Sequence, residues 1–198
     1  MKLFKNIKKW LENQEHLFYL FLLILIVPNI ILCFTEPMPV VAKVCNVLLP
    51  FAFYYLLMTL SRNCGKMFWI LFLFIFFGAF QIVLLYLFGQ SIIAVDMFLN
   101  LVTTNSSEAM ELLDNLVPAL VSVIILYIPA LILAAISIIK KRKLSPEFIR
   151  RERKKAWIAL LIGFISLGAA YGLDKRYELK SDLYPANVCY NVALAFQR

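Results

Sequence analysis

Histidine and closely spaced cysteines are almost missing from this sequence. The only histidine is His16, and the four cysteines, Cys33, Cys45, Cys64 and Cys189, show no C-x-x-C spacing. Because most zinc sites in proteins are built from neighbouring Cys and His side chains, this pattern excludes a self-contained site of that kind. Three of the cysteines fall near one side of the membrane in the topology derived below. These three cysteines either include one disulfide or are all free thiols.

Charged residues are also scarce, and their scarcity excludes an ordinary soluble domain. Only 16% of the 198 residues are charged, whereas 63% are hydrophobic, compared with roughly 45–50% apolar residues in soluble domains. The net charge of +8 invites a nucleic-acid interpretation. However, the basic residues stand in short runs between apolar stretches, where membrane topology explains them better. We therefore expect no nucleic-acid partner.

Long apolar runs dominate the chain. Five segments carry no charged residue: Leu17–Phe34, Val44–Leu60, Met67–Phe88, Val117–Ile139 and Ala156–Leu173. At about 1.5 Å per residue each approaches the roughly 30 Å hydrocarbon core, and in lipid such segments must be helical. The sequence predicts an all-α integral membrane protein with five transmembrane helices, the first retained as an anchor. Asn46 and Pro50 interrupt the second segment, which could begin as an interfacial turn near Cys45.

The basic residues predict the orientation. They precede the first span, lie between spans two and three, and crowd into residues 140–155, whereas the 89–116 connection has none. By the positive-inside rule the N-terminus is cytoplasmic and the C-terminus lies outside. The 140–155 segment is either a topology determinant or a binding site for anionic head groups. In the last span, Gly168 and Gly172 form a small-x-x-x-small pair that favours close helix packing.

The outward-facing 89–116 connection is where the sequence places its candidate chemistry. Asn105 stands three residues before Glu108, which is the spacing of a capping box. The sequence predicts a short amphipathic helix here, followed by Pro118 at the start of the fourth span. Glu108 either caps its own helix or holds the ammonium of an ethanolamine head group, while the amide of Asn100 donates to the phosphate. The two roles are compatible.

These residues also resemble a known family. Asn100, Thr104, Glu108 and Ala109, followed by Leu112 and Leu113, are similar to the N-x-x-x-T-x-x-x-E-A-x-x-L-L pattern in the periplasmic connection of phosphoethanolamine transferases. Those bacterial inner-membrane enzymes belong to the alkaline-phosphatase-like superfamily and have five N-terminal helices. The resemblance implies a substrate site at Asn100, Thr104 and Glu108. It also implies phosphatidylethanolamine as donor, and lipid A or a related glycolipid as acceptor.

The resemblance further implies a division of the chain. Residues 1–173 are expected to form the transmembrane domain, and residues 174–198 a periplasmic segment that leads towards a catalytic domain. The family uses a threonine nucleophile activated by zinc, which needs three or four converging ligands. After Leu173 this sequence offers only Asp174, Glu178 and Asp182, which we expect on an exposed helix with ion pairs. The chain is therefore not catalytic alone, and zinc is expected in a catalytic domain that these 198 residues lack.

Other functions stay open at this point. A membrane domain similar to that of lipoteichoic acid synthase shares the five-helix plan. A small transport protein would need polar groups inside the spans, and the candidates are few: Asn29, Asn46, Gln81 and Ser122. A non-enzymatic assembly protein would use the small residues of the last span to dock a partner. We expect these 198 residues to be either a fragment of a larger enzyme or a stand-alone paralogue of its membrane domain.

Overall fold

A computed structural model describes residues 10–88 and 106–197. Within those ranges the chain forms helices and no strands. Their bounds are α2 (Gln14–Thr35), α3 (Val40–Met58), α4 (Cys64–Ile70), α5 (Phe72–Phe88), α7 (Ser106–Ile139), α8 (Pro146–Leu173), α9 (Leu179–Asp182) and α10 (Ala186–Gln197). The all-α fold predicted from the sequence is confirmed for this part of the chain.

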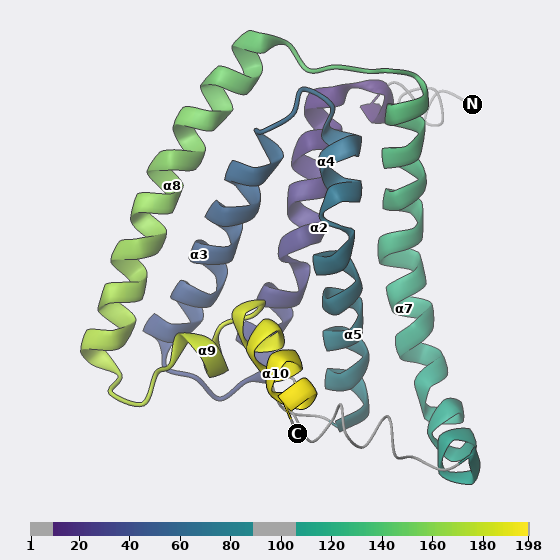
Figure 1. Cartoon of the computed structure of the whole chain (residues 1–198), viewed down its shortest axis with the longest axis vertical. Helices are drawn as coiled ribbons and strands as arrows, with labels where there is room; N and C mark the ends of the chain where they lie inside the picture. Colours follow the sequence, from purple (N-terminus) through teal and green to yellow (C-terminus); the bar gives the residue numbers. More distant parts are fainter. Residues whose placement is uncertain (1–9, 89–105, 198) are drawn as a thin grey trace.

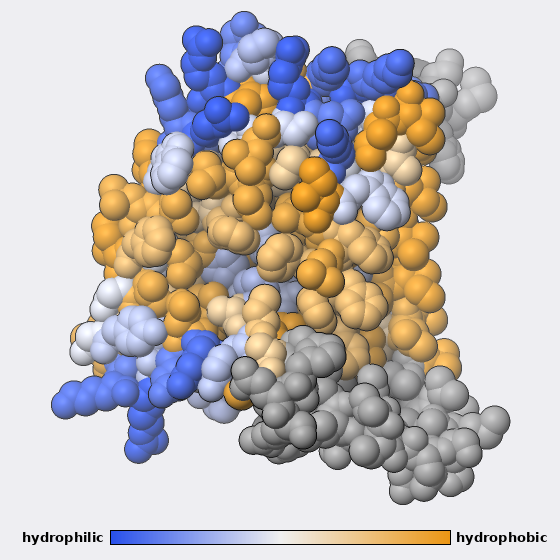
Figure 2. All heavy atoms as spheres, in the orientation of Figure 1, coloured by the Kyte–Doolittle hydropathy of each residue, from blue (hydrophilic) through white to orange (hydrophobic). Residues whose placement is uncertain are grey.

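The long helices identify a multi-pass membrane protein. Among the described residues, α2, α3, α7 from Val117 onwards and α8 are each long and apolar enough to cross a membrane. The pair α4 and α5 passes the same test together, which gives four spans or five. Figure 2 shows the corresponding surface, with a broad apolar band between two ends that carry hydrophilic side chains.

The helices stand side by side in the order α8, α3, α2, α4 with α5, and α7 (Figure 1). The connection from Lys140 to Ser145 joins α7 to α8 at one end of the bundle, which we call the basic end. Helices α9 and α10 lie at the opposite end, which we call the tail end, and the first residue of α7 lies at that end too.

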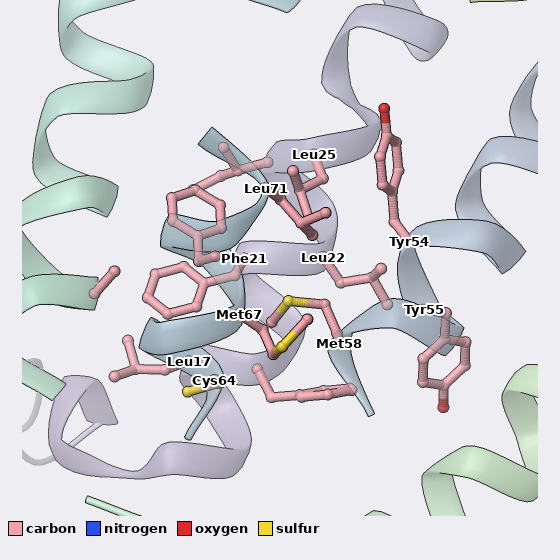
Figure 3. Packing of buried hydrophobic residues seen from close by; sticks show 14 of the residues in the cluster. Leu17, Phe21, Leu22, Leu25, Tyr54, Tyr55, Met58, Cys64, Met67 and Leu71 are labelled. Carbon is pink, nitrogen blue, oxygen red and sulfur yellow. The ribbon is translucent and has the colours of Figure 1, made fainter. Parts of the chain in front are cut away.

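The main core lies where α2, α3 and α4 meet (Figure 3). Phe21 of α2 stacks on Phe68 of α4 with ring centroids 4.4 Å apart. Met58 of α3 and Met67 of α4 fill the space beside them, as flexible methionine side chains commonly do. Lipid is as apolar as these side chains, so the shape of their packing, rather than the hydrophobic effect, favours helix association here.

Two glycines allow neighbouring helices to approach each other closely. A Cβ atom on Gly65 of α4 would lie 2.3 Å from the backbone oxygen of Ala134 in α7. On Gly163 of α8 it would lie 3.1 Å from the Cα atom of Leu49 in α3. In contrast, no described atom lies within 4 Å of the Cβ positions of Gly168 and Gly172. The pair predicted to favour close packing therefore has no helix against it within the described part of the chain.

The predicted third span is divided. A single helix was expected over Met67–Phe88, but α4 ends at Ile70 and α5 begins at Phe72, with an angle of 62° between them. Leu71 still forms both backbone hydrogen bonds of a helix. Its amide donates to the Met67 carbonyl at 3.0 Å, and its carbonyl accepts from the Ile75 amide at 3.1 Å. Sharp kinks usually coincide with proline or glycine. Neither occurs between Lys66 and Gly78, so no sequence signal marks this bend.

The segments flanking the last two spans are more helical than predicted. Residues 106–116, expected as a separate short helix, are the first turns of α7, and Pro118 lies inside that helix rather than at its start. Residues 146–155, expected within a loop, open α8, where the Ser145 hydroxyl accepts a hydrogen bond from the Phe148 amide. Serine followed by proline at the first helical position is a strong helix start. The second span is likewise a complete helix from Val40.

A buried carboxylate attaches α8 to α3 near the basic end. Glu152 is fully buried and accepts a hydrogen bond from the Tyr55 hydroxyl of α3. Its ion pairs come from its own helix, at 2.8 Å from Arg151 Nε and 3.0 Å from Lys155 Nζ, and the Tyr19 side chain of α2 also interacts with the carboxylate. Because the carboxylate is paired with two cations as well as a hydroxyl, its charge is compensated where water is excluded.

Candidate functional site

The C-terminal segment, residues 174–197, folds back onto the tail end of the bundle (Figure 1). Four of its apolar or aromatic side chains are buried: Tyr177, Leu183, Tyr184 and Val188. Tyr177 and Leu183 pack with Ala42 and Cys45 of α3 and with Ala170 of α8. The segment is therefore part of the packed structure and covers the tail end of the bundle.

Two buried asparagines hold this segment in place. Asn29 of α2 donates to the backbone carbonyls of Asn46 and Tyr184, at 2.9 and 2.8 Å. Asn46 of α3 donates to the Asp182 carbonyl at 2.7 Å and accepts from the Tyr177 hydroxyl at 3.1 Å. Burial raises the pKa of the Tyr177 phenol, which keeps its proton available for this bond. The polar residues inside the first two spans thus serve as anchors for a distant segment.

Tyr184 reaches furthest into the bundle. Its hydroxyl donates to the Phe74 carbonyl of α5 at 3.1 Å. A Cβ atom on Gly78 would lie 3.0 Å from the Tyr127 hydroxyl and 3.1 Å from the Tyr184 hydroxyl. It would also meet the Pro28 ring at 3.0 Å. Because Gly78 has no side chain, residues from α2, α7 and the C-terminal segment can converge on α5 at this point.

The carboxylates of the C-terminal segment do not lie on one exposed helix, which corrects the prediction. Asp174 accepts from the Arg176 amide at 3.0 Å, and Asp182 accepts from the Glu178 amide at 2.7 Å. These are local turn and capping contacts, which short acidic side chains form readily. Of the predicted ion pairs, Glu178 with Lys180 is present at 3.4 Å.

Several buried polar atoms find no hydrogen-bond partner among the described residues. They include the Asn29 side-chain oxygen, the Tyr127 hydroxyl and both polar atoms of the Asn187 side chain. An unsatisfied buried group costs about 1–3 kcal/mol. Asn29 lies in α2, Tyr127 in α7 and Asn187 in α10. The elements around the C-terminal segment therefore keep polar atoms without a hydrogen-bond partner among the described residues.

An apolar groove runs beside the C-terminal segment. Its volume is about 360 Å³. One wall is made by the C-terminal segment, through Leu179, Leu183, Pro185, Ala186 and Cys189, and the others by α3, α5 and α8. Phe53 of α3 and Phe164 of α8 line it and are 40% and 56% exposed. In a membrane such exposed apolar side chains face lipid, so the groove opens towards the bilayer rather than towards water.

The predicted site residues are only partly within the described chain. Asn100 and Thr104 lie outside the described residues. Glu108 belongs to the first turn of α7, which begins at Ser106, but its side chain lies outside the described part. The start of α7 and the C-terminal segment lie at the same end of the bundle (Figure 1). From the sequence, Asn29 and Asn46 were identified only as polar residues inside spans. In the structure their side chains attach the C-terminal segment to α2 and α3.

Metal-binding side chains do not cluster in the described residues. No group of three or more His, Cys, Asp or Glu side chains there could hold a metal ion. All four cysteines are free thiols, with Cys45 and Cys64 buried and Cys189 exposed. The residues present do not fit a zinc centre, and we assign no zinc-dependent step to them.

Comparisons with known protein families, with characterised proteins and with solved structures found no match for this chain.

Proposed function

We propose that this chain is the membrane domain of a phosphoethanolamine transferase, which binds phosphatidylethanolamine at the outer leaflet of a bacterial inner membrane. In this proposal α4 and α5 together form one span, which gives five. The N-terminus and the basic end face the cytoplasm, because most Lys and Arg side chains lie there. The tail end then faces the periplasm.

The apolar groove at the tail end is the observation that carries the proposal. A diacyl phospholipid needs an apolar channel for a chain and polar groups near the head group. The groove is lined by apolar side chains and by Cys189, and it adjoins a segment fixed by Asn29 and Asn46. The start of α7, which carries the Glu108 backbone, lies at the same end. The proposal is supported by the location of the groove and of the start of α7 at the same end of the bundle.

The proposed head-group chemistry rests on the sequence pattern Asn100, Thr104 and Glu108. The carboxylate of Glu108 accepts hydrogen bonds from the ammonium of ethanolamine, which carries three N–H donors. Asn100 and Thr104 each offer a donor to the phosphate oxygens. A position near the start of α7 favours an anionic side chain through the helix dipole.

In this proposal the chain binds and positions the donor lipid, and another domain performs the transfer. That domain would supply the threonine nucleophile and the zinc ligands, and the C-terminal segment would fix its position above the membrane. The acceptor is lipid A or a related envelope glycolipid. The rigid attachment of residues 177–188 to α2 and α3 supports this positioning role, because a loosely held connection would not orient a following domain.

Replacing Glu108 by alanine is expected to abolish the preference for phosphatidylethanolamine over phosphatidylcholine. The trimethylammonium of phosphatidylcholine has no N–H donor, so only the ethanolamine lipid gains from the carboxylate. A charge-assisted hydrogen bond contributes about 1.5–3 kcal/mol, which corresponds to at least about a tenfold preference. The preference is measured by native mass spectrometry of the purified chain titrated with equal mixtures of the two lipids.

Glu111→Ala is the matched control for this experiment, because it removes the same charge from the same helix three residues later. It should leave the lipid preference within twofold of the unchanged chain. Equal lipid preference in the unchanged chain and in Glu108→Ala would contradict the proposed role of Glu108.

A further inference from the structure

A second hollow lies at the basic end, far from the C-terminal segment. It measures about 390 Å³ and lies between Arg62, which follows α3, and the first turns of α8. Three further cations line it: Arg150, Arg153 and Lys154. Together they bring four positive charges to one small concave surface, which we call the basic pocket.

The helical spacing of α8 explains why these side chains gather. Ile149, Arg150, Arg153, Lys154 and Trp157 all line the pocket. Their spacing of three and four residues places them on one face of the helix. Arg151 and Lys155, in the same turns, are directed instead to the buried Glu152 carboxylate, at 2.8 and 3.0 Å. The helix therefore has one face of compensated cations and one of uncompensated cations.

None of the four pocket cations has a carboxylate within 4.0 Å among the described residues. The other ion pairs there involve Arg142 with Glu12 and Lys180 with Glu178. Two of the pocket guanidinium groups are instead positioned by backbone oxygens. Arg62 Nε donates to the Leu144 carbonyl at 3.0 Å, and Arg153 donates to the Thr59 carbonyl at 2.6 Å. These bonds hold two of the guanidinium groups in place without neutralising their charge, which a bound anion would compensate.

The pocket is also placed at the level of a membrane interface. Trp157 lines it and is 57% exposed, as expected for the aromatic belt between lipid tails and head groups. Directly beyond Trp157, α8 presents exposed apolar side chains that include Ile158, Leu161 and Ile165. A ligand with a phosphate in the pocket could therefore continue as hydrocarbon along α8.

From these features we infer that the basic pocket binds the head group of an anionic phospholipid in the leaflet at the basic end. The phosphate lies among Arg62, Arg150, Arg153 and Lys154, and an acyl chain follows α8 past Trp157. A zwitterionic lipid is disfavoured, because its ammonium would meet the same four uncompensated cations. This site is independent of the proposed donor site, which lies at the opposite end and relies on a carboxylate.

The test compares two double variants that remove the same charge. Arg150→Gln with Lys154→Gln acts inside the pocket, whereas Lys140→Gln with Lys143→Gln acts at the same end but outside it. Among the described residues, none of these four side chains forms an ion pair or a side-chain hydrogen bond that the substitution would remove. Each purified chain is titrated with phosphatidylglycerol in nanodiscs, and bound lipid is counted by native mass spectrometry. The pocket variant should bind the lipid about tenfold more weakly, and the control within twofold of the unchanged chain.

Equal weakening by both double variants would overturn the inference, because it would mean a diffuse attraction to the whole basic end. A second arm adds glycerol phosphate in large excess. The lipid should stay bound, since the acyl chain contributes to its affinity. Full displacement by glycerol phosphate would show a site for a soluble phosphate ester and would also overturn the inference.

Discussion

Replacing Gly65 by alanine is expected to lower the stability of the bundle by about 2 kcal/mol. A Cβ atom at this position would lie 2.3 Å from the Ala134 carbonyl oxygen and 3.0 Å from the Ser137 Cβ atom. The nearest atom is backbone, so it cannot rotate away, and α4 must move from α7. Overpacking of this kind typically costs 1–3 kcal/mol. Alanine gains only about 1 kcal/mol in helix propensity, so the steric loss dominates.

The measurement is the midpoint of thermal unfolding in detergent, followed by size-exclusion chromatography. Gly168→Ala and Gly172→Ala in α8 are matched controls, because no described atom of another element lies within 4 Å of their Cβ positions. They should unfold at the same temperature as the unchanged chain or slightly higher, since only the gain in helix propensity applies. A Gly65→Ala chain as stable as these controls would show that α4 and α7 do not touch as described.

Replacing Glu152 by alanine is expected to be about equally damaging. The change leaves the Tyr55 hydroxyl without its acceptor and removes the carboxylate that pairs with Arg151 and Lys155. Breaking a buried pair costs about 3–5 kcal/mol. Here both cations are more than half exposed, which screens their part of the loss, so we expect about 2–3 kcal/mol.

The attachment of α8 to α3 can be followed by hydrogen exchange. Glu152→Ala should increase exchange in the first turns of α8, and Glu152→Gln should restore part of the protection, because an amide oxygen still accepts from Tyr55. Glu147→Ala is the control, since this carboxylate lies exposed in the same helix and forms no ion pair within the described part of the chain. Equal exchange in the Glu152→Ala and Glu147→Ala chains would contradict the role of Glu152 in attaching α8 to α3.

The sequence predicted the helical class and the position of the spans because the bilayer imposes one simple rule. A charge-free run long enough to cross must be a helix, and the Asn105–Glu108 spacing predicted a helix start near Ser106, where α7 begins. The bend at Leu71 was not predictable, since neither proline nor glycine marks it. The extension of α8 back to Pro146 carries a sequence signal, Ser145 followed by proline, which the prediction of a basic loop over these residues did not use.

The arrangement at the tail end was beyond sequence reasoning for a different reason. The bond from Asn29 to the Tyr184 carbonyl joins residues 155 positions apart, and its acceptor is backbone, which has no sequence signature. The sequence shows that Asn29 and Asn46 place polar side chains inside spans, where burial is unfavourable. A transport role and an anchoring role would both place polar side chains there. Only the contacts distinguish them. The candidate residues Asn100 and Thr104 lie outside the described residues, so their role stays a prediction from sequence.

The central claim is that phosphatidylethanolamine occupies the apolar groove at the tail end, and photo-crosslinking tests it most directly. The chain is reconstituted in vesicles containing phosphatidylethanolamine with a photoactivatable acyl chain, and the cross-linked peptides are identified by mass spectrometry. The account predicts that cross-links concentrate on groove residues such as Phe53, Phe164 and Leu183. Ile125 of α7, which is 69% exposed and lies outside the groove, is the internal control for ordinary lipid contact. Cross-links spread evenly over the groove and the exposed face of α7 would contradict the claim.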